Sequence, residues 1–409
     1  MTLEGWRTVG LLDVAEIASG QVDPRELPFA GWPLVAPNHI EEGTGRLLPA
    51  PTAQEQGAIS GKYTFLPGDV LYSKIRPYLR KVALPQFSGL CSADMYPLRS
   101  KGEIEPGFML ALLLGRDFTE FATSVSMRTG IPKINREELA KFRCLLPPLP
   151  EQRKIAAILS SVDDAIEGTQ AVIDQLQVVK KAMMAELLTR GLPGRHTRFK
   201  QTEIGEVPVG WEVARLDEMA SVERGKFSHR PRNDPRFFGG EYPFIQTGDV
   251  AASGGRILSF AQTLNDDGLA ISRLFPAGTI IITIAANIGD TGIATFPVAF
   301  PDSLVGIQAG DRIDNRFLEL VLRTRKKSLE DAAPQNAQKN INLETLRPLV
   351  IQVPPAPEQR EIADFFEAMC QRVGAEVETL AVLRAVKSAL MSVLLTGEIR
   401  VTPDEATPS

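Results

Sequence analysis

Two short segments gather basic side chains of the kind that bind nucleic acid. Residues 72–81 contain no acid, and residues 224–236 contain only Asp234. Lysine and arginine can neutralise phosphates, arginine can bind guanine through two hydrogen bonds, and asparagine or glutamine can bind adenine. We therefore predict DNA contacts in both segments, whereas the plainer alternative is a solvated basic face. The basic and aromatic residues concerned are Tyr72, Lys74, Arg76, Tyr78, Arg80 and Lys81 in the first segment, and Arg224, Lys226, Phe227, Arg230, Arg232 and Arg236 in the second.

The chain as a whole is acidic and shows no catalytic signature. Its 409 residues include 45 Lys and Arg against 50 Asp and Glu, so any nucleic-acid site must be concentrated locally. The motifs GxGxxG, GxxxxGK[ST], HExxH and CxxC are absent, and there are only three histidines. Residues 233–237 resemble an amine-holding methyltransferase motif but lack its second proline, and Asp302 has no nuclease-like partners. The sequence thus predicts a protein that binds and does not react, with no metal site and no cofactor of its own.

Composition predicts a packed cytoplasmic protein without a membrane span. Apolar residues make up 44% of the chain and charged residues 23%, and no apolar run approaches the ~18 residues of a transmembrane helix. Cys91, Cys144 and Cys370 stand alone, so we expect buried, reduced thiols.

An internal repeat divides the chain into two similar halves. The sequence LPPLPEQRKIAAIL at 146–159 recurs as VPPAPEQREIADFF at 353–366, 207 positions later. Gly5-Trp6 similarly matches Gly210-Trp211, and Ile134-Asn135 matches Ile341-Asn342. Residues 20–130 and 225–335 have diverged. This period is too long for a solenoid. It indicates two domains that are similar at both ends and differ in the residues between.

Each half ends in a long helix. Apolar residues recur at coiled-coil spacing from Ile155 to Leu187 and from Ile362 to Leu394, and Pro150 suits a first helical turn. Glu151 lies where a carboxylate favours the helix dipole. Each helix should span about 40 residues, roughly 60 Å. We expect the two to pack antiparallel with a domain at each end, with polar residues in the seam setting the register: Thr169, Lys180, Glu376 and Lys387.

The remaining parts predict α+β domains. Residues 69–75 and 279–284 are β-rich runs after a turn, and residues 244–250 suggest a strand leading into a loop. The predicted divisions are a first domain at 1–149, a first helix at 150–190, a linker at 191–204, a second domain at 205–356, a second helix at 357–397 and a tail at 398–409.

The sequence resembles the specificity subunits of type I restriction-modification enzymes. The resemblance covers nearly the whole chain and rests on both PEQR helix starts, IGEVPVGW at 204–211, YPFIQTGDV at 242–250, KNIN at 339–342 and LLTGEIRV at 394–401. It implies two target recognition domains, each reading half of a split site in double-stranded DNA, separated by two helices that dock two methyltransferase subunits. With it we expect further DNA contacts from Lys133, Gln246, Thr247 and Lys339.

The resemblance also implies where the chemistry resides. S-adenosylmethionine would be bound by the methyltransferase subunits, and ATP with Mg by restriction subunits that drive translocation and cleavage. Two alternatives from other classes are a protein scaffold that binds no DNA and a self-sufficient modification enzyme with an unrecognised site.

Overall fold

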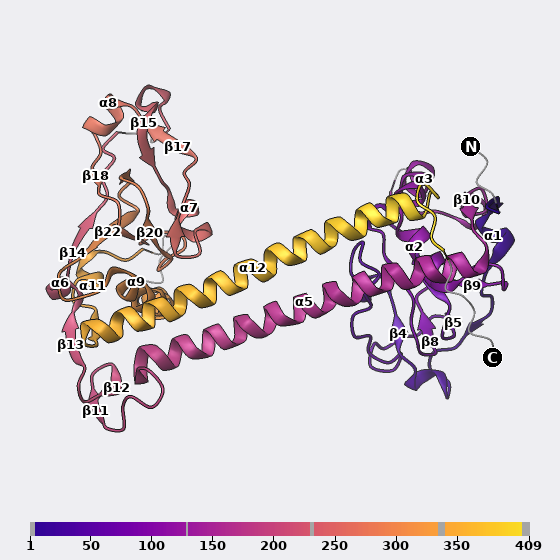
Figure 1. Cartoon of the computed structure of the whole chain (residues 1–409), viewed down its shortest axis with the longest axis horizontal. Helices are drawn as coiled ribbons and strands as arrows, with labels where there is room; N and C mark the ends of the chain where they lie inside the picture. The colour runs from indigo at the N-terminus through magenta and orange to yellow at the C-terminus, as the bar shows by residue number, and fades with distance from the viewer. Residues whose placement is uncertain (1–4, 128–129, 230–232, 334–339, 403–409) are drawn as a thin grey trace. The chain divides into compact units, whose positions relative to one another are not determined.

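The computed structural model describes residues 5–127, 130–229, 233–333 and 340–402, and divides into two compact units (Figure 1). The first unit comprises residues 1–172 and 376–409, and the second comprises residues 173–375. Each unit therefore contains one α+β domain, half of the first long helix and half of the second.

The first unit is built on two four-stranded sheets. One has the order β2-β9-β6-β7 and the other the order β3-β5-β8-β4, in which β4 and β8 run parallel. A separate pair, β1 with β10, brings the start of the domain beside the strand that precedes the long helix. The elements are β1 (Arg7–Gly10), α1 (Leu11–Val14), β2 (Ala15–Ile17), β3 (Gln21–Val22), β4 (Leu34–Val35), β5 (Lys62–Phe65), β6 (Val70–Ser73), β7 (Val82–Ala83), β8 (Gly89–Cys91), β9 (Met95–Ser100), α2 (Pro106–Leu114), α3 (Arg116–Ser126), α4 (Arg136–Leu139), β10 (Arg143–Leu146) and α5 (Leu149–Arg190).

The second unit has the same arrangement of two sheets, with further strands and helices. Its first sheet has the order β14-β22-β19-β20-β16, and its second has the order β17-β15-β21-β18 with β15 parallel to β21. The pair β13 with β23 matches β1 with β10. The elements are β11 (Phe199–Thr202), β12 (Gly205–Pro208), β13 (Glu212–Arg215), α6 (Leu216–Met219), β14 (Ala220–Arg224), β15 (Phe238–Phe244), α7 (Thr247–Ala252), β16 (Arg256–Ile257), β17 (Gln262–Leu264), α8 (Asp266–Ala270), β18 (Leu274–Phe275), β19 (Ile280–Thr283), β20 (Thr291–Ala294), β21 (Val298–Ala299), β22 (Leu304–Ala309), α9 (Asn315–Thr324), α10 (Lys326–Ala332), α11 (Leu343–Leu346), β23 (Val350–Val353) and α12 (Ala356–Leu394).

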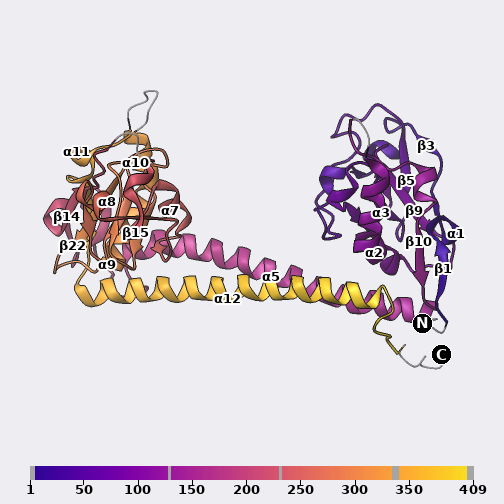
Figure 2. The ribbon, with the colours of Figure 1, turned by 90° about the horizontal axis from the view of Figure 1, so that it is seen from above.

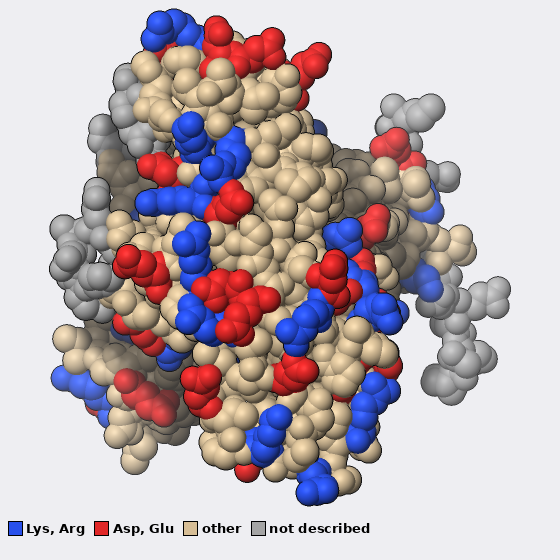
Figure 3. All heavy atoms as spheres, turned by 90° about the vertical axis from the view of Figure 1, so that its left-hand side faces the viewer, with Lys and Arg blue, Asp and Glu red and all other residues tan. Residues whose placement is uncertain are grey.

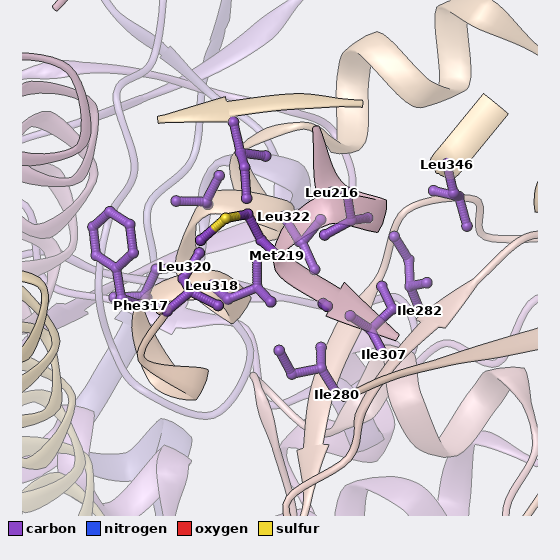
Figure 4. Close-up of a cluster of buried hydrophobic side chains, with 14 of the residues drawn as sticks. Leu216, Met219, Ile280, Ile282, Ile307, Phe317, Leu318, Leu320, Leu322 and Leu346 are labelled. Carbon is purple, nitrogen blue, oxygen red and sulfur yellow. The ribbon is translucent and has the colours of Figure 1, made fainter. Parts of the chain in front are cut away.

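The main core of each unit lies between its first sheet and the helices. In the second unit, Ile280, Ile282 and Ile307 project from the sheet toward α9 and α6, where Phe317 and Met219 are fully buried (Figure 4). Residues of the long helices complete both cores, because Ile155 and Leu394 belong to the first and Leu187 and Ile362 to the second. Each domain therefore needs its helical segments to bury its apolar surface.

The long helices confirm the predicted seam. Helix α5 has 42 residues and α12 has 39, and every predicted seam position is buried or half-buried. Within each unit the two helical segments run in opposite directions along one side of the domain (Figure 2). Lys387 links the two helices at the seam: its Nζ lies 2.5 Å from Asp163 and donates to the carbonyl of Thr44 at 3.2 Å. Helix α5 ends at Arg190, before Gly191 with a positive φ of 78°.

The repeated Glu-Gln pair fastens each domain to its helix. The indole of Trp6 donates to the Glu151 carboxylate at 3.0 Å, and that of Trp211 donates to Glu358 at 3.0 Å. Both carboxylates are buried, at 3% and 2% exposure, so their hydrogen bonds are shielded from water. The dipole role expected for Glu151 is thus the smaller part of its function, because its side chain mainly accepts hydrogen bonds.

The adjacent glutamines also connect each long helix to its domain through hydrogen bonds. Gln152 accepts from the backbone N–H of Glu105 at 2.8 Å, and Gln359 accepts from that of Asp314 at 2.6 Å. Glu105 and Asp314 are the N-caps of α2 and α9. One dipeptide therefore positions two elements, the Trp-bearing start of the domain and the helix that covers its sheet.

Each carboxylate also holds a segment that follows the other long helix. Arg400 donates to Glu151 at 2.7 and 2.9 Å, whereas Nε2 of His196 lies 2.8 Å from Glu358. Burial raises the pKa of Glu151, but the hydrogen bonds from Arg400 and Trp6 and the charge of Arg400 outweigh it, so the pKa lies below its usual value.

Two expectations from the sequence are wrong in detail. Residues 247–252 form helix α7 and not a loop, because the Asp249 carboxylate accepts from the Gln246 backbone N–H at 2.7 Å and closes a helical first turn. Cys91 and Cys144 are buried, and burial raises their pKa values to about 12 and about 11, but Cys370 is exposed on α12 beside the seam. The segment 191–204 also contains strand β11, which pairs with β12 as a hairpin.

We expect Glu358→Ala to lower the free energy of unfolding by about 1–3 kcal/mol, because it leaves the buried indole N–H of Trp211 without its acceptor. Glu361→Ala is the matched control: Glu361 pairs with Arg195 at the exposed surface, and its loss should cost less than about 1 kcal/mol. Urea unfolding followed by tryptophan fluorescence measures both. Equal losses in the two variants would contradict the role given to Glu358.

Candidate nucleic-acid interface

The basic segment of the first unit forms a corner between β6 and β7. A 3-10 turn at Pro77–Leu79 lies between Arg76 and Arg80, whose φ values of 49° and 48° place both in the left-handed region. The carbonyl of Pro132 accepts from the Arg76 N–H at 2.7 Å, and Ile75 forms a bridge with Lys133. The fold thus brings Lys133 beside the corner, as the DNA-binding prediction requires.

The basic side chains predicted to contact DNA at this corner differ in whether they already have a partner within the protein. Arg76, Arg80 and Lys133 are exposed, and within the described residues none has a side-chain hydrogen bond or ion pair. Lys74 lies over the Tyr96 ring at 5.4 Å, and Lys81 donates to the carbonyl of Pro37 at 2.9 Å. Three of the five cations are therefore free to meet a polyanion.

Of the three aromatic residues in the predicted DNA-binding segments, Tyr78 alone is exposed. Its side chain is 51% exposed, whereas Tyr72 and Phe227 are at 1% and 2%. Tyr72 packs edge-on against Phe118 in the core, and burial raises its pKa well above the usual value. Tyr72 and Phe227 are structural residues: Tyr72 belongs to the main core of the first unit, in a strand whose four residues are all buried, and Phe227 belongs to an aromatic cluster with Phe244.

An open hollow of about 390 Å³ lies at the same corner. Arg76 and Lys81 contribute to its wall, with Asn38 from the loop after β4 and Asp94 from the loop before β9. Sequence reasoning missed Asn38 and Asp94, because they lie far from the basic segment and carry no local motif. The full lining is Ala36, Pro37, Asn38, Ser73, Ile75, Arg76, Leu79, Lys81, Ser92 and Asp94.

The predicted residues of the second unit gather around an aromatic cluster. Phe227 contacts Phe237 at 6.1 Å and Phe244 at 5.3 Å between ring centroids. Lys226 precedes the first of these rings, and Gln246 follows the last by two residues, so the cluster holds both at one end of the domain. Lys226 is exposed, Gln246 donates to the side chain of Gln262 at 2.6 Å, and half-buried Thr247 begins α7.

The two described arginines of this patch already have partners. Arg224 donates to the carbonyl of Asp302 at 2.5 Å, and Arg236 makes a two-pronged contact with Asp234 at 2.8 and 3.2 Å. Hydrogen bonds from Arg236 lower the pKa of Asp234 to about 2, so the pair is ionised and neutral overall at physiological pH. Arg230, Arg232 and Lys339 lie outside the described residues, and their assignment remains a prediction.

Positive charge does not dominate the visible face of the second unit. Figure 3 shows lysine and arginine interspersed with acidic side chains there. Contact with DNA must therefore be local, as the net charge of −5 also implies. Among the described residues there is no cluster of His, Cys, Asp and Glu suited to a metal ion, and no helix with the length and apolar character of a membrane span.

Sequence comparison decides the family. Residues 3–178 and 208–383 each match the type I restriction modification DNA specificity domain. The chain belongs to this family. It is 29% identical to the putative type I restriction enzyme MjaX specificity subunit of Methanocaldococcus jannaschii, over 97% of this chain and 94% of that one. It is 37% identical to the EcoDI specificity subunit of Escherichia coli, over 44% of this chain and 42% of that one.

Solved structures have the same fold. A chain from work on complex assembly and conformational transition of the type I R-M system is 21% identical, with a TM-score of 0.64 and coverage of 97% and 99%. The HsdS subunit of Thermoanaerobacter tengcongensis is 22% identical, with a TM-score of 0.51 and coverage of 97% and 98%. This protein is thus a non-catalytic specificity subunit with two target recognition domains, and of the three functions weighed from the sequence, sequence-specific DNA recognition is supported.

We expect Arg76→Gly to raise the free energy of unfolding by up to about 1 kcal/mol, because glycine adopts a left-handed conformation without steric strain. Ala286, with a φ of 62°, is a matched site in the second unit, and Ala286→Gly should stabilise similarly. Only Arg76→Gly should also weaken DNA binding, because Ala286 has no charge to lose. Urea unfolding and DNA titration measure the two effects, and a loss of stability in Arg76→Gly would contradict the assignment of strain.

Proposed function

We propose that each target recognition domain of this specificity subunit binds one half of a bipartite site in duplex DNA. The observation that carries the proposal is the set of free cations at the β6–β7 corner, in a chain that is otherwise acidic. In the first domain Arg76, Arg80 and Lys133 would contact the DNA, with Lys74 and Lys81 behind them. Phosphate contacts would supply affinity, and a few base contacts would supply sequence choice.

The second domain would bind through different elements. Its proposed surface consists of Arg224 at the end of β14, Lys226, residues 230–236 and the start of α7 at Gln246 and Thr247, with Lys339 as a further contact. Asp234 would release Arg236 when a phosphate competes for the guanidinium, since an exposed ion pair is weak.

The long helices would dock the partner subunits. Helix α5 exposes Val172 and Val178, and α12 exposes Val377, Val382 and Val386, so both helices offer apolar side chains that a partner could cover. We assign these surfaces to two methyltransferase subunits that carry S-adenosylmethionine, and we expect restriction subunits that use ATP and Mg to join the assembly. The chain itself would bind none of these cofactors.

The direct test is to coexpress the chain with its methyltransferase subunits and sequence the methylated adenines of the host genome. We expect one motif with two defined halves and an unspecified spacer, and binding of that motif by the purified complex that weakens as salt rises. Salt-independent binding, or methylation without a bipartite motif, would contradict the proposal.

We expect Asp234→Ala to tighten DNA binding by the complex at low salt. The change frees Arg236 and removes a negative charge, so the dependence of log K on log salt should steepen by about 0.9, the value for one more phosphate contact. Asp23→Ala is the matched control, because Asp23 holds Arg25 by the same two-pronged contact and also has a pKa of about 2. Arg25 lies outside the proposed surface, so the same shift in both variants would contradict the assignment of Arg236.

A further inference from the structure

The corner that carries Arg76 recurs in the second domain with matching backbone hydrogen bonds, although it is one residue shorter there and lacks the 3-10 turn. The N–H of Ser73 donates to the carbonyl of Lys81, and that of Thr283 donates to Asp290, both at 2.9 Å. The carbonyls of Lys74 and Ile284 accept from Ile134 and Ile341 respectively, again at 2.9 Å. These bonds make residues 74, 81 and 134 equivalent to 284, 290 and 341.

The side chains at the equivalent positions are unlike. Arg76 corresponds to Ala286, and both have a left-handed backbone. Lys81 corresponds to Asp290, whose carboxylate lies 2.5 Å from Lys326. Asp94 corresponds to Ser303, because their carbonyls accept from residues 74 and 284 at 2.9 and 3.1 Å. The backbone of the corner belongs to the shared frame, whereas its side chains are where the two domains differ.

The hollow at the first corner combines donors with an acceptor. Arg76, Asn38 and Asp94 line it, and all three are exposed without a side-chain hydrogen bond among the described residues. The negative charge of the Asp94 carboxylate would repel a phosphate, so the hollow is poorly suited to bind phosphate alone. Base edges need both kinds of group, because guanine offers acceptors to arginine and the cytosine amino group donates to a carboxylate.

The cations around the hollow complement this arrangement. Arg80 follows the 3-10 turn and Lys133 lies across the bridge from Ile75, and neither side chain lines the hollow. Both side chains are exposed near the hollow, so they are available for phosphate contacts.

We propose that this hollow is a base-reading site of the first target recognition domain, with Arg76 and Asp94 as specificity-determining residues. Arg76 donates to the major-groove edge of a guanine, and Asp94 accepts from the exocyclic amino group of a cytosine. The inference rests on the proposed function, because it requires that the first domain binds duplex DNA.

The test compares Arg76→Lys with Arg80→Lys in the assembled methyltransferase complex. Both variants keep a positive charge at a left-handed position, but only the first removes a two-pronged donor from the hollow. We expect Arg76→Lys to reduce discrimination by tenfold or more, on the order of one good base contact, at one or two positions of one half-site. Arg80→Lys should leave the motif unchanged.

Asp94→Ala gives an independent readout. It should relax a neighbouring position in the same half-site, and neither variant should alter the other half-site. Methylated-adenine sequencing reports the motifs, and titration of the purified complex with matched and mismatched duplexes reports the fold-change. Urea unfolding confirms that each variant is folded.

Two results would overturn the inference while the proposed function stands. An unchanged motif in Arg76→Lys and Asp94→Ala would show that the hollow reads no base. A uniform loss of affinity for all sequences in Arg76→Lys would make Arg76 a phosphate contact. If the wild-type complex shows no salt-dependent binding to duplex DNA, the proposed function itself fails.

Discussion

A buried carboxylate at the first turn of each long helix holds the rest of its unit in place. Glu151 and Glu358 each accept a hydrogen bond from the tryptophan at the start of a domain, and the neighbouring glutamines hold the N-caps of α2 and α9. A buried charge is costly unless every lone pair finds a donor, so these contacts must form together. The constraint explains why Pro-Glu-Gln recurs almost unchanged while the sequence between the two copies has diverged.

The secondary structure that these contacts hold is shared by the two domains, whereas the charged side chains on its surface differ. Both domains keep a sheet with β6 or β19 near its centre, a left-handed corner after that strand and a covering helix. Charge is placed differently: the first domain has Arg76 and Lys81 at its corner, and the second has Ala286 and Asp290 there, with its cations after β14. Two different DNA half-sites can therefore be read from one architecture.

The features that the sequence predicted are those with a strong local pattern. The seam from Ile155 to Leu187 and its repeat show the spacing of a coiled coil, and the runs at 69–75 and 279–284 contain β6 and β19. Helix α7 was missed because its first turn depends on one Asp249 hydrogen bond within a β-like sequence. Asp94 and Asn38 could not be found, since they meet Arg76 only after three distant loops fold together. Tyr72 was misjudged because the local composition does not show that β6 is buried on both faces.

The central claim is that two similar frames read DNA independently. Its most direct measurement is methylated-adenine sequencing of a hybrid in which residues 20–130 come from a relative with a different site. Because the Trp6–Glu151 contact and the long helices α5 and α12 lie outside the exchanged region, the hybrid should keep its fold when the relative supplies its own α2 and an N-cap for Gln152 to bind. The account predicts that one half-site changes while the other half-site and the spacer remain. A change in both half-sites in an active hybrid would contradict independent reading.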